Sequence, residues 1–289
     1  MRYLEPVFRP PSEASSYILQ VTYGCSHNAC AFCGMYRTKR FKIRSFDEVR
    51  EDIEEVARRY PGIRRVFLAD GDAMILKTDK LIAILDELGK AFVGLDRVGI
   101  YADARGINSK TGQELLELRE RKLGIVYLGL ESGNDDVLKS VVKGVTAGEM
   151  TESVHRAKGA GIRTSVIALL GLAGKALSEA HAADTARVIS AMSPDYFSAL
   201  TLTLVPGTDL AEQAQRGDFQ MLTPEESLEE LYRMVEPISV SRAMVFRTNH
   251  ASNYVTLKGT LPDDKSAVLD KIRWAIEHKV LRPEWMRGL

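Results

Sequence analysis

Tyr17-Ile-Leu-Gln-Val-Thr-Tyr-Gly-Cys25-Ser-His-Asn-Ala-Cys30-Ala-Phe-Cys33 is a β-rich run that passes directly into a loop, and this loop holds all three cysteines of the 289-residue chain. Three thiolates can bind three irons of a cubane iron–sulfur cluster, whereas a fully ligated cluster usually takes four cysteines, one per iron. The sequence contains no fourth cysteine. The loop therefore predicts a cluster whose remaining iron is open to a small molecule.

Zinc is the main alternative to the iron–sulfur cluster. His27 could complete a set of three cysteines and one histidine, but structural zinc sites normally draw their ligands from two separated segments. A disulfide framework is disfavoured because the number of cysteines is odd. Inert core thiols would not explain why the cysteines cluster beside His27 and Asn28. The spacing favours the cluster over zinc, and zinc over inert thiols.

The composition narrows the class of protein. Hydrophobic residues make up 45% of the chain, and 39 Lys and Arg balance 39 Asp and Glu, so the formal net charge is zero. A neutral chain argues against nucleic acid as a partner, since proteins that bind it usually carry a basic excess. No window reaches the ~18 apolar residues of a membrane span, and the N-terminus lacks a signal peptide. Because metal-binding thiols must stay reduced, we expect a cytoplasmic protein with no membrane partner.

Strand-like runs alternate with stretches of helical periodicity as far as residue 207. The predicted strands are Tyr17–Thr22, Arg65–Ala69, Arg97–Tyr101, Ile125–Leu130, Thr164–Leu170 and Tyr196–Leu202. The predicted helices between them are Phe46–Tyr60, Thr78–Lys90, Ser109–Lys122, Ala147–Gly159 and Ser178–Met192. Repeated β-α units require a parallel sheet. The pattern therefore predicts an α/β fold, a partial (β/α)₆ barrel similar to a TIM barrel.

The pattern changes after residue 207. Thr223–Glu236 and Asp264–His278 are predicted helices, and residues 241–262 between them are predicted to be irregular. We expect residues 1–207 to form the barrel, with the cluster loop at 24–34, and residues 208–289 to form a mostly helical extension that could cover the substrate. Because the barrel begins almost at the N-terminus, we expect no cobalamin-binding domain ahead of it.

Polar and glycine residues follow the predicted strands at their carboxyl ends, where βα barrels carry their active sites. Gly71 and Asp72 follow the second strand, Glu131 ends the fourth, and Gly171 and Val205 follow the fifth and sixth. Loops in such folds are polar and glycine-rich by default. The informative signal is that these positions share an edge with the cysteine loop, which follows the first strand.

Over residues 15–207 the chain resembles the radical S-adenosylmethionine (SAM) enzymes. The resemblance rests on Cys25, Cys30 and Cys33, Phe32 between the last two cysteines, Gly71-Asp72, and Leu128-Gly-Leu-Glu-Ser-Gly133. The run from Val137 to Thr146 is similar to the branch that holds oxygen-independent coproporphyrinogen dehydrogenase and the methylthiotransferases. The family fold, a partial (β/α)₆ barrel, agrees with the strand pattern.

The chain departs from the family pattern in the cysteine motif, in the turn after the second strand, and around Ile167, where a position on the fifth strand that is often polar in this branch is apolar. The family spacing is CxxxCxxC, whereas this chain has CxxxxCxxC, with one more residue between Cys25 and Cys30. The glycine-glycine-glutamate turn of the family corresponds here to Gly71-Asp72-Ala73. The additional residue in the cysteine motif affects the path of residues 26–29. The altered turn affects how the backbone would bind the amino group of SAM.

The resemblance implies a 4Fe–4S cluster and SAM as cofactors. It implies that Cys25, Cys30 and Cys33 each bind one iron and that the amino and carboxylate groups of SAM chelate the fourth. The implied SAM contacts are Glu131 to a polar group, Lys143 to the carboxylate, Gly71 and Asp72 at the amino group, and Phe32, Gly171 and Val205 around adenine. One electron would then cleave SAM to methionine and a 5′-deoxyadenosyl radical that abstracts hydrogen from a substrate.

Three of these residues also have ordinary structural interpretations. Glu131 could cap a helix that begins near Asn134, where a carboxylate gains from the helix dipole. Lys143 could be an exposed cation at a helix end, since lysine is rarely buried. Asp72 could be a turn residue.

Two polar segments are candidates for binding the substrate. Tyr36 and Arg37 stand at the start of a stretch that has five basic residues between 37 and 44. Such a stretch suits a carboxylate or phosphate, although charge runs usually form a solvated surface. The second segment contains Asn249, His250 and Asn253 and suggests a polar pocket wall or lid.

We expect an anaerobic radical SAM enzyme that acts on a small polar or anionic molecule and takes electrons from a donor such as flavodoxin or ferredoxin. A methyltransferase that uses two SAM molecules, an enzyme that modifies RNA, and an enzyme that acts on a porphyrin precursor are alternatives. A non-catalytic iron–sulfur or haem-carrying protein on the same scaffold is another. Auxiliary clusters are disfavoured because they need their own cysteines.

Overall fold

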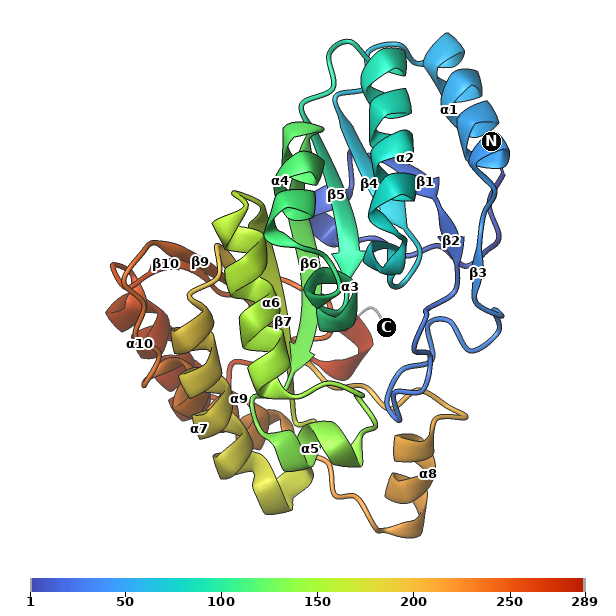
Figure 1. The fold of residues 1–289 in the computed structure, drawn as a ribbon. Coiled ribbons are helices and arrows are strands. Elements are labelled where there is room, and N and C mark those ends of the chain that lie inside the picture. The colour runs from blue at the N-terminus through green and yellow to red at the C-terminus, as the bar shows by residue number, and fades with distance from the viewer. Residues whose placement is uncertain (1, 288–289) are drawn as a thin grey trace. The chain divides into compact units, whose positions relative to one another are not determined.

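The computed structural model describes residues 2–287 (Figure 1). Contacts within the chain divide it into two compact units. Among the described residues, the first unit consists of residues 2–28, 35–128 and 152–164, and the second of residues 29–34, 129–151 and 165–287. The cysteine loop thus contributes to both units, with Cys25 in the first and Cys30 and Cys33 in the second.

Parallel strands and the helices between them build the first unit. Its strands are β1 (Tyr17–Gln20), β4 (Arg65–Ala69), β5 (Arg97–Ala102) and the first part of β6 (Leu123–Glu131), each parallel to the next. Two short antiparallel strands, β2 (Thr22–Tyr23) and β3 (Lys42–Ile43), flank the cysteine loop in sequence. Its helices are α1 (Phe46–Arg59), α2 (Thr78–Ala91), α3 (Ala104–Asn108) and α4 (Gly112–Glu120), and α2 packs between α1 and α4 (Figure 1).

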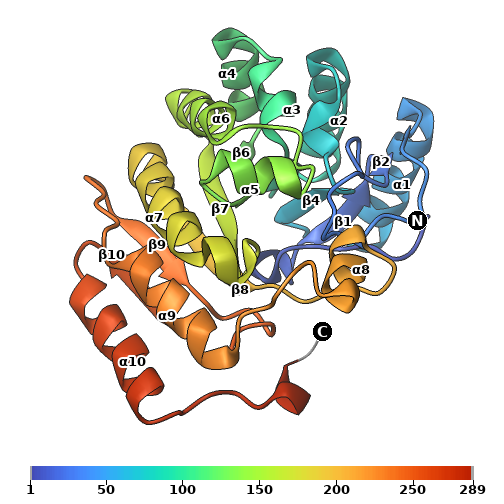
Figure 2. The same ribbon diagram turned by 90° about the horizontal axis from the view of Figure 1, so that it is seen from below.

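The second unit continues the alternation and ends in a hairpin. Its strands are most of β7 (Arg163–Leu170), then β8 (Tyr196–Thr201), β9 (Met244–Arg247) and β10 (Lys258–Leu261). β7, β8 and β9 are parallel, and β10 is antiparallel to β9. The helices are α5 (Asp135–Ser140), α7 (Gly174–Met192), α8 (Asp209–Arg216), α9 (Pro224–Val235) and α10 (Lys265–Glu277), while α6 (Ala147–Gly159) has residues in both units. Figure 2 shows α9 beside both α7 and α10.

The α/β fold class predicted from the sequence is confirmed. The strand order of the main sheet is β1-β4-β5-β6-β7-β8-β9-β10. Several elements have the predicted bounds, such as β4 at Arg65–Ala69 and α6 at Ala147–Gly159. Among the described residues, no helix is both long and apolar enough to cross a membrane.

The prediction that residues 241–262 are irregular is wrong for β9 and β10. In β9, the buried Met244 and Phe246 alternate with Val245 and Arg247, which are more exposed. Four residues of alternation are too few to identify a strand from the sequence. The strand forms because β8 pairs with it, and the Phe197 and Phe246 rings then pack with their centroids 5.7 Å apart.

Two predicted helix starts are also wrong. The helix predicted at 109–122 is α4, which begins only at Gly112: Ser109 is the C-cap of the preceding α3, and the Thr111 side chain caps α4 by accepting a hydrogen bond from the Glu114 N–H. The helix predicted to start at Ser178 begins at Gly174 instead. Ser178 is buried inside α7, where its hydroxyl donates to the carboxylate of Glu230.

Glu230 connects α9 to the carboxyl end of β7. Its side chain is fully buried, and its Oε1 accepts a hydrogen bond of 2.6 Å from the Gly171 N–H. Burial raises the pKa of the Glu230 carboxyl to about 7, and the hydrogen bonds from Ser178 and Gly171 partly oppose that shift. Burial lowers the pKa of the neighbouring His181 to about 4, so this imidazole is neutral at pH 7.

We expect stability to depend on pH through Glu230. Because its pKa is raised from 4.5 to about 7, the unfolded chain releases this proton before the folded protein does. Stability contributed by Glu230 is therefore present below pH ~4.5 and is lost as the pH rises through ~7, a change on the order of 3 kcal/mol.

Urea unfolding of the wild type and Glu230→Gln between pH 5 and 8 measures this effect. The stability of the wild type relative to the variant is expected to fall as the pH rises. His181 acts in the opposite direction between pH ~4 and ~6.5, and its Nε2 lies 3.7 Å from Glu230 Oε1, so the two proteins are compared most directly between pH ~6.5 and 8. A difference between the two proteins that does not change with pH contradicts the assignment.

Candidate active site

The first half of the cysteine loop lies against the turn that follows β4. The Gly24 N–H donates a hydrogen bond of 3.0 Å to Asp70 Oδ2, and the Gly71 N–H donates to the Gly24 carbonyl at 3.2 Å. Ser26 donates its hydroxyl proton to Asp72 Oδ2, and the Asp103 N–H donates to Asp72 Oδ1 at 3.1 Å. The half-buried Cys25 therefore lies between two residues that this turn binds.

Both carboxylate oxygens of Asp72 have hydrogen-bond partners within the protein. Its side chain is 1% exposed. Burial raises the pKa of the Asp72 carboxyl, and the hydrogen bond from Ser26 partly opposes the shift. Asp72 is therefore more than an exposed turn residue, because its carboxylate links the cysteine loop to the end of β5.

His27 is held by an arginine. Arg105 Nη1 lies 3.2 Å from His27 Nδ1, and because a guanidinium can only donate, Nδ1 is the acceptor and the proton is on Nε2. Arg105 also donates to Asp103 at 2.7 Å. Burial opposes the charge of Arg105, but this hydrogen bond and the charges of Asp103, Asp72 and Cys25 raise its pKa. Zinc ligation through Nδ1 would have to break the bond to Arg105.

The basic stretch after the loop is not a uniformly solvated surface. Lys39 is buried and pairs with Asp70 at 2.9 Å, and Arg44 is buried and pairs with Asp52 at 2.7 Å. Arg37 is exposed. The predicted solvated surface is therefore wrong for Lys39 and Arg44, because each compensates a buried carboxylate that the local sequence does not reveal.

Tyr36, predicted to meet the substrate, lies inside the first unit. It is 4% exposed, and its ring packs edge-on against Phe8 with centroids 5.6 Å apart. The backbone carbonyl of Tyr36 accepts a hydrogen bond of 3.1 Å from the Asn28 side chain. Tyr36 thus helps fix the path of the loop residues between Cys25 and Cys30.

The second half of the cysteine loop is docked within the second unit by backbone hydrogen bonds. The Ala31 N–H donates to the Val141 carbonyl at 2.9 Å, and the Leu210 N–H donates to the Ala31 carbonyl at 3.0 Å. Ala31 belongs to a buried apolar cluster against which Phe32 packs; its other members are Val137, Val141, Leu172, Leu202 and Leu210. Cys30 and Cys33, on either side of this anchor, are half-buried.

Glu131 and Lys143 form an ion pair. Lys143 Nζ lies 3.4 Å from Glu131 Oε1, and the two side chains are 11% and 12% exposed. Asn134, not Glu131, caps α5, since its Oδ1 accepts from the Val137 N–H. The two structural interpretations are thus wrong: Glu131 is not the helix cap, and Lys143 is not an exposed cation.

The turn after Glu131 is fastened to α7. The Asn134 N–H donates to Ser132 Oγ at 3.0 Å, and Ser132 Oγ lies 2.8 Å from His181 Nδ1. His181 Nε2 lies 3.1 Å from the Leu169 carbonyl, which accepts from it. Sequence reasoning missed His181 and Glu230, and their only local signal is a polar residue on the buried face of a predicted helix.

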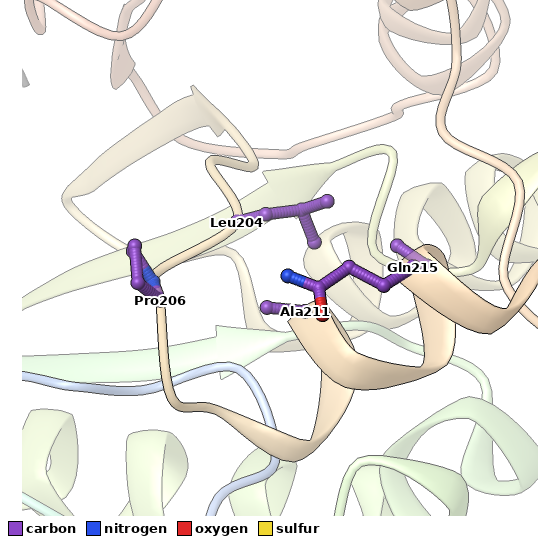
Figure 3. A pocket seen from close by; sticks show the side chains of 5 residues that line it. Leu204, Pro206, Ala211 and Gln215 are labelled. Atoms are coloured by element: carbon purple, nitrogen blue, oxygen red, sulfur yellow. The ribbon is translucent and has the colours of Figure 1, made fainter.

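A shallow cavity of about 290 Å³ is formed by residues that include the two sequence neighbours of Val205. Leu204, Pro206, Ala211, Ala214 and Gln215 line it. Figure 3 shows the amide of Gln215 between Leu204, Pro206 and Ala211. Val205 itself is 37% exposed, and a Cβ at Gly34 would lie 2.5 Å from its Cγ1. The cysteine loop and Val205 are therefore in close contact.

The polar segment of the C-terminal extension is fastened to the carboxyl end of β8. Asn253 is buried, with Thr201 donating to its Oδ1 at 3.0 Å and its amide donating to the Ala199 carbonyl at 2.9 Å. His250 is half-buried, and burial lowers its pKa. Asn249 is exposed. Asn253 thus connects the polar segment to β8, whereas Asn249 remains accessible to solvent.

The three thiols suit the iron of a cluster. All three are half-buried in one short loop, and both halves of the loop are anchored by the hydrogen bonds above. Thiolates are the ligands that iron–sulfur clusters usually take, so the chemistry of the three side chains fits such a cluster.

Curated proteins of known sequence are similar to this chain over part of their length. It is 29% identical over 242 residues to tRNA-2-methylthio-N(6)-dimethylallyladenosine synthase of Alkalilimnicola ehrlichii, which covers 80% of this chain and 52% of that protein. It is 26% identical over 199 residues to an uncharacterized methyltransferase of Pyrococcus horikoshii, covering 68% and 41%. The chain therefore spans about half the length of these relatives.

Solved structures show the same fold at low sequence identity. Coproporphyrinogen III oxidase of Escherichia coli aligns with a TM-score of 0.58 at 17% identity, covering 76% of this chain and 51% of that one. Methylornithine synthase aligns with a TM-score of 0.55 at 15% identity, covering 89% and 68%. These likenesses confirm the predicted partial barrel.

The sequence model of the radical SAM superfamily matches residues 19–186, which include the cysteine loop, the turn after β4, and Glu131 with Lys143. The match agrees with the fold and with the thiols of the loop. The chain belongs to the radical SAM superfamily, and its cofactors are a 4Fe–4S cluster and SAM.

Proposed function

We propose that this protein cleaves SAM reductively and abstracts a hydrogen atom from a small polar or anionic substrate. The observation that carries the proposal is the grouping around α5 in the second unit. Glu131 precedes this helix, Lys143 follows it, and Val141 at its end binds the loop segment that holds Cys30 and Cys33. One short helix thus connects a buried ion pair to two thiols.

The ion pair suits a zwitterionic ligand. At 3.4 Å, the contact between Lys143 and Glu131 is longer than a charge-assisted hydrogen bond of full strength. A ligand with a carboxylate for the ammonium and a donor group for the carboxylate could replace this contact without leaving a buried charge unpaired. SAM has both, and we assign its carboxylate to Lys143 and a hydroxyl or amino group to Glu131.

The surroundings of Phe32 and Val205 suit an adenine ring. Phe32 and the loop around Gly171 contribute to one apolar region, since Leu172 is in the buried cluster against which Phe32 packs. The cavity beside Val205 adds apolar walls and a single amide, that of Gln215. Bound there, SAM would supply a 5′-deoxyadenosyl radical after one-electron reduction, and the protein would supply orientation and exclusion of water.

The substrate is proposed to be polar because the segment that follows β9 in the second unit presents polar side chains. Asn249 is exposed there, and His250 is half-buried. We propose that residues 208–289 cover the substrate, since residues 252 and 253 bind the carboxyl end of β8. A flavodoxin or ferredoxin would supply the electron in an anaerobic, reducing cytoplasm, where the thiols stay reduced.

Methyl transfer is the second candidate function. It is favoured by the names of the two relatives, a methylthio-tRNA synthase and a methyltransferase. The formal net charge of zero argues against RNA as the substrate.

The products formed from SAM distinguish hydrogen abstraction, methyl transfer and a non-catalytic role. With the cluster reconstituted and a strong reductant present, we expect the wild type to convert SAM to 5′-deoxyadenosine and methionine, and we expect Cys33→Ser to form neither, because one iron loses its thiolate. Chromatography of the reaction mixture measures both products. S-adenosylhomocysteine as the main product would favour methyl transfer, and absence of any SAM product in the wild type would favour a non-catalytic role.

Lys143→Ala is expected to weaken SAM binding about 10- to 100-fold, as loss of a charge-assisted hydrogen bond implies. Isothermal titration under anoxic conditions measures the dissociation constant. Lys139→Ala is the matched control, because Lys139 lies in the last turn of α5 and is exposed. Equal affinities for the two variants would remove Lys143 from the SAM site.

A further inference from the structure

We propose that the turn Asp70-Gly71-Asp72 positions Cys25, the first of the three thiols, and that Asp70 and Asp72 are positioning residues for the cluster. Three consecutive residues of the turn contact three consecutive residues of the loop, Gly24, Cys25 and Ser26. All of them belong to the first unit. The inference rests on the proposed role of Cys25 as an iron ligand.

Asp70 fixes the residue before Cys25. Its Oδ2 accepts hydrogen bonds from the Gly24 N–H at 3.0 Å, Gln20 Nε2 at 3.0 Å and Lys39 Nζ at 2.9 Å. Asp70 and Lys39 are both fully or almost fully buried. This one oxygen thus accepts hydrogen bonds from β1 before the loop, from the first residue of the loop and from Lys39, which lies a short way after the loop, so neither flank of the loop can shift alone.

Gly71 leaves room for the Cys25 side chain because it has no Cβ. A Cβ at residue 71 would lie 3.0 Å from the Cys25 Cβ and 2.5 Å from the Tyr36 ring. A contact under 3.0 Å with a buried ring cannot be relieved without moving the turn or the loop. The glycine therefore lets the turn approach the cysteine directly, with the Gly71 N–H bonded to the Gly24 carbonyl.

Asp72 fixes the residue after Cys25. Its Oδ2 accepts the Ser26 hydroxyl proton, and its Oδ1 accepts from the Asp103 backbone at the end of β5. The additional residue between Cys25 and Cys30 gives residues 26–29 more conformational freedom. The hydrogen bond from Ser26 to Asp72 restricts that freedom at the first residue of this segment. His27 and Asn28 are then held by Arg105 and the Tyr36 carbonyl.

Cluster properties measured without SAM test the inference. Ser26→Ala and Asp72→Asn are each expected to change the electron paramagnetic resonance spectrum of the reduced cluster and to speed iron loss to a chelator. The expected acceleration is about fivefold, as loss of one ordinary hydrogen bond implies. Because Ser26→Ala removes this bond and Asp72→Asn weakens the same bond by taking away the charge of its acceptor, the double variant should show little more than the larger single effect.

The chain offers a matched control pair. Ser16 donates its hydroxyl proton to the fully buried Glu13, as Ser26 does to Asp72, but the hydrogen bonds of Ser16 and Glu13 described for the first unit do not reach the cysteine loop. Ser16→Ala and Glu13→Gln are therefore expected to lower thermal stability and to leave the cluster spectrum and iron release unchanged. Ser26→Thr, which keeps the hydroxyl, should restore the wild-type spectrum.

The inference would be overturned if Ser26→Ala and Asp72→Asn both showed the same spectrum and the same rate of iron release as the wild type. It would also be overturned if both variants kept the cluster unchanged and lost SAM affinity, since the turn would then act on SAM. If Asp72→Asn fails to fold, Ser26→Ala decides, because Ser26 is only half-buried. Failure of SAM cleavage in the wild type affects the proposed function and leaves this measurement intact, because no SAM is present in it.

Discussion

The buried ion pair between Lys39 and Asp70 is the constraint on which the arrangement of the cysteine loop depends. A carboxylate without contact to water is costly unless it is paired and hydrogen-bonded. Asp70 Oδ2 meets this requirement with donors from Gln20, Gly24 and Lys39, which lie before, at the start of and after the loop, while the buried Oδ1 has no hydrogen-bond partner among the described residues. Satisfying one buried charge thus brings distant parts of the chain together. The geometry is specific because any other path of the loop would leave that charge without its donors.

The second half of the loop, residues 29–34, is held by different interactions. Residues 29–34 are docked by the backbone of Ala31, which accepts from and donates to residues on either side of it in space, and by apolar packing of Phe32. Backbone hydrogen bonds fix position without depending on side-chain charge. The half that carries Cys25 is therefore set by electrostatics, and the half that carries Cys30 and Cys33 is set by main-chain geometry and hydrophobic contact.

The sequence was sufficient for features that are encoded locally. Strand and helix bounds such as those of β4 and α6 follow from periodicity, and the capping box at Ser45 marks the start of α1. Features that need a distant partner were not predictable. Lys39 and Arg44 look like exposed cations until Asp70 and Asp52 are placed against them, and β9 is a strand only because β8 pairs with it.

The candidate site divides in the same way. Cysteine spacing and the positions of Glu131 and Lys143 could be read from motifs. The contact between Glu131 and Lys143 could not, because the two residues are twelve positions apart in sequence with α5 between them. The burial of Asp72 was equally hidden, since its partners Ser26 and Asp103 come from two other loops.

The neutral imidazole of His181 gives the second unit a hydrogen-bond chain with one direction. Protons are donated from the Asn134 backbone to Ser132, from Ser132 to Nδ1 of the ring, and from Nε2 to the Leu169 carbonyl. Aligned donors polarise one another, so the chain is stronger than its separate links. It also ties the end of β6 to the end of β7 within the second unit, because Ser132 directly follows Glu131 and Leu169 lies two residues before Gly171.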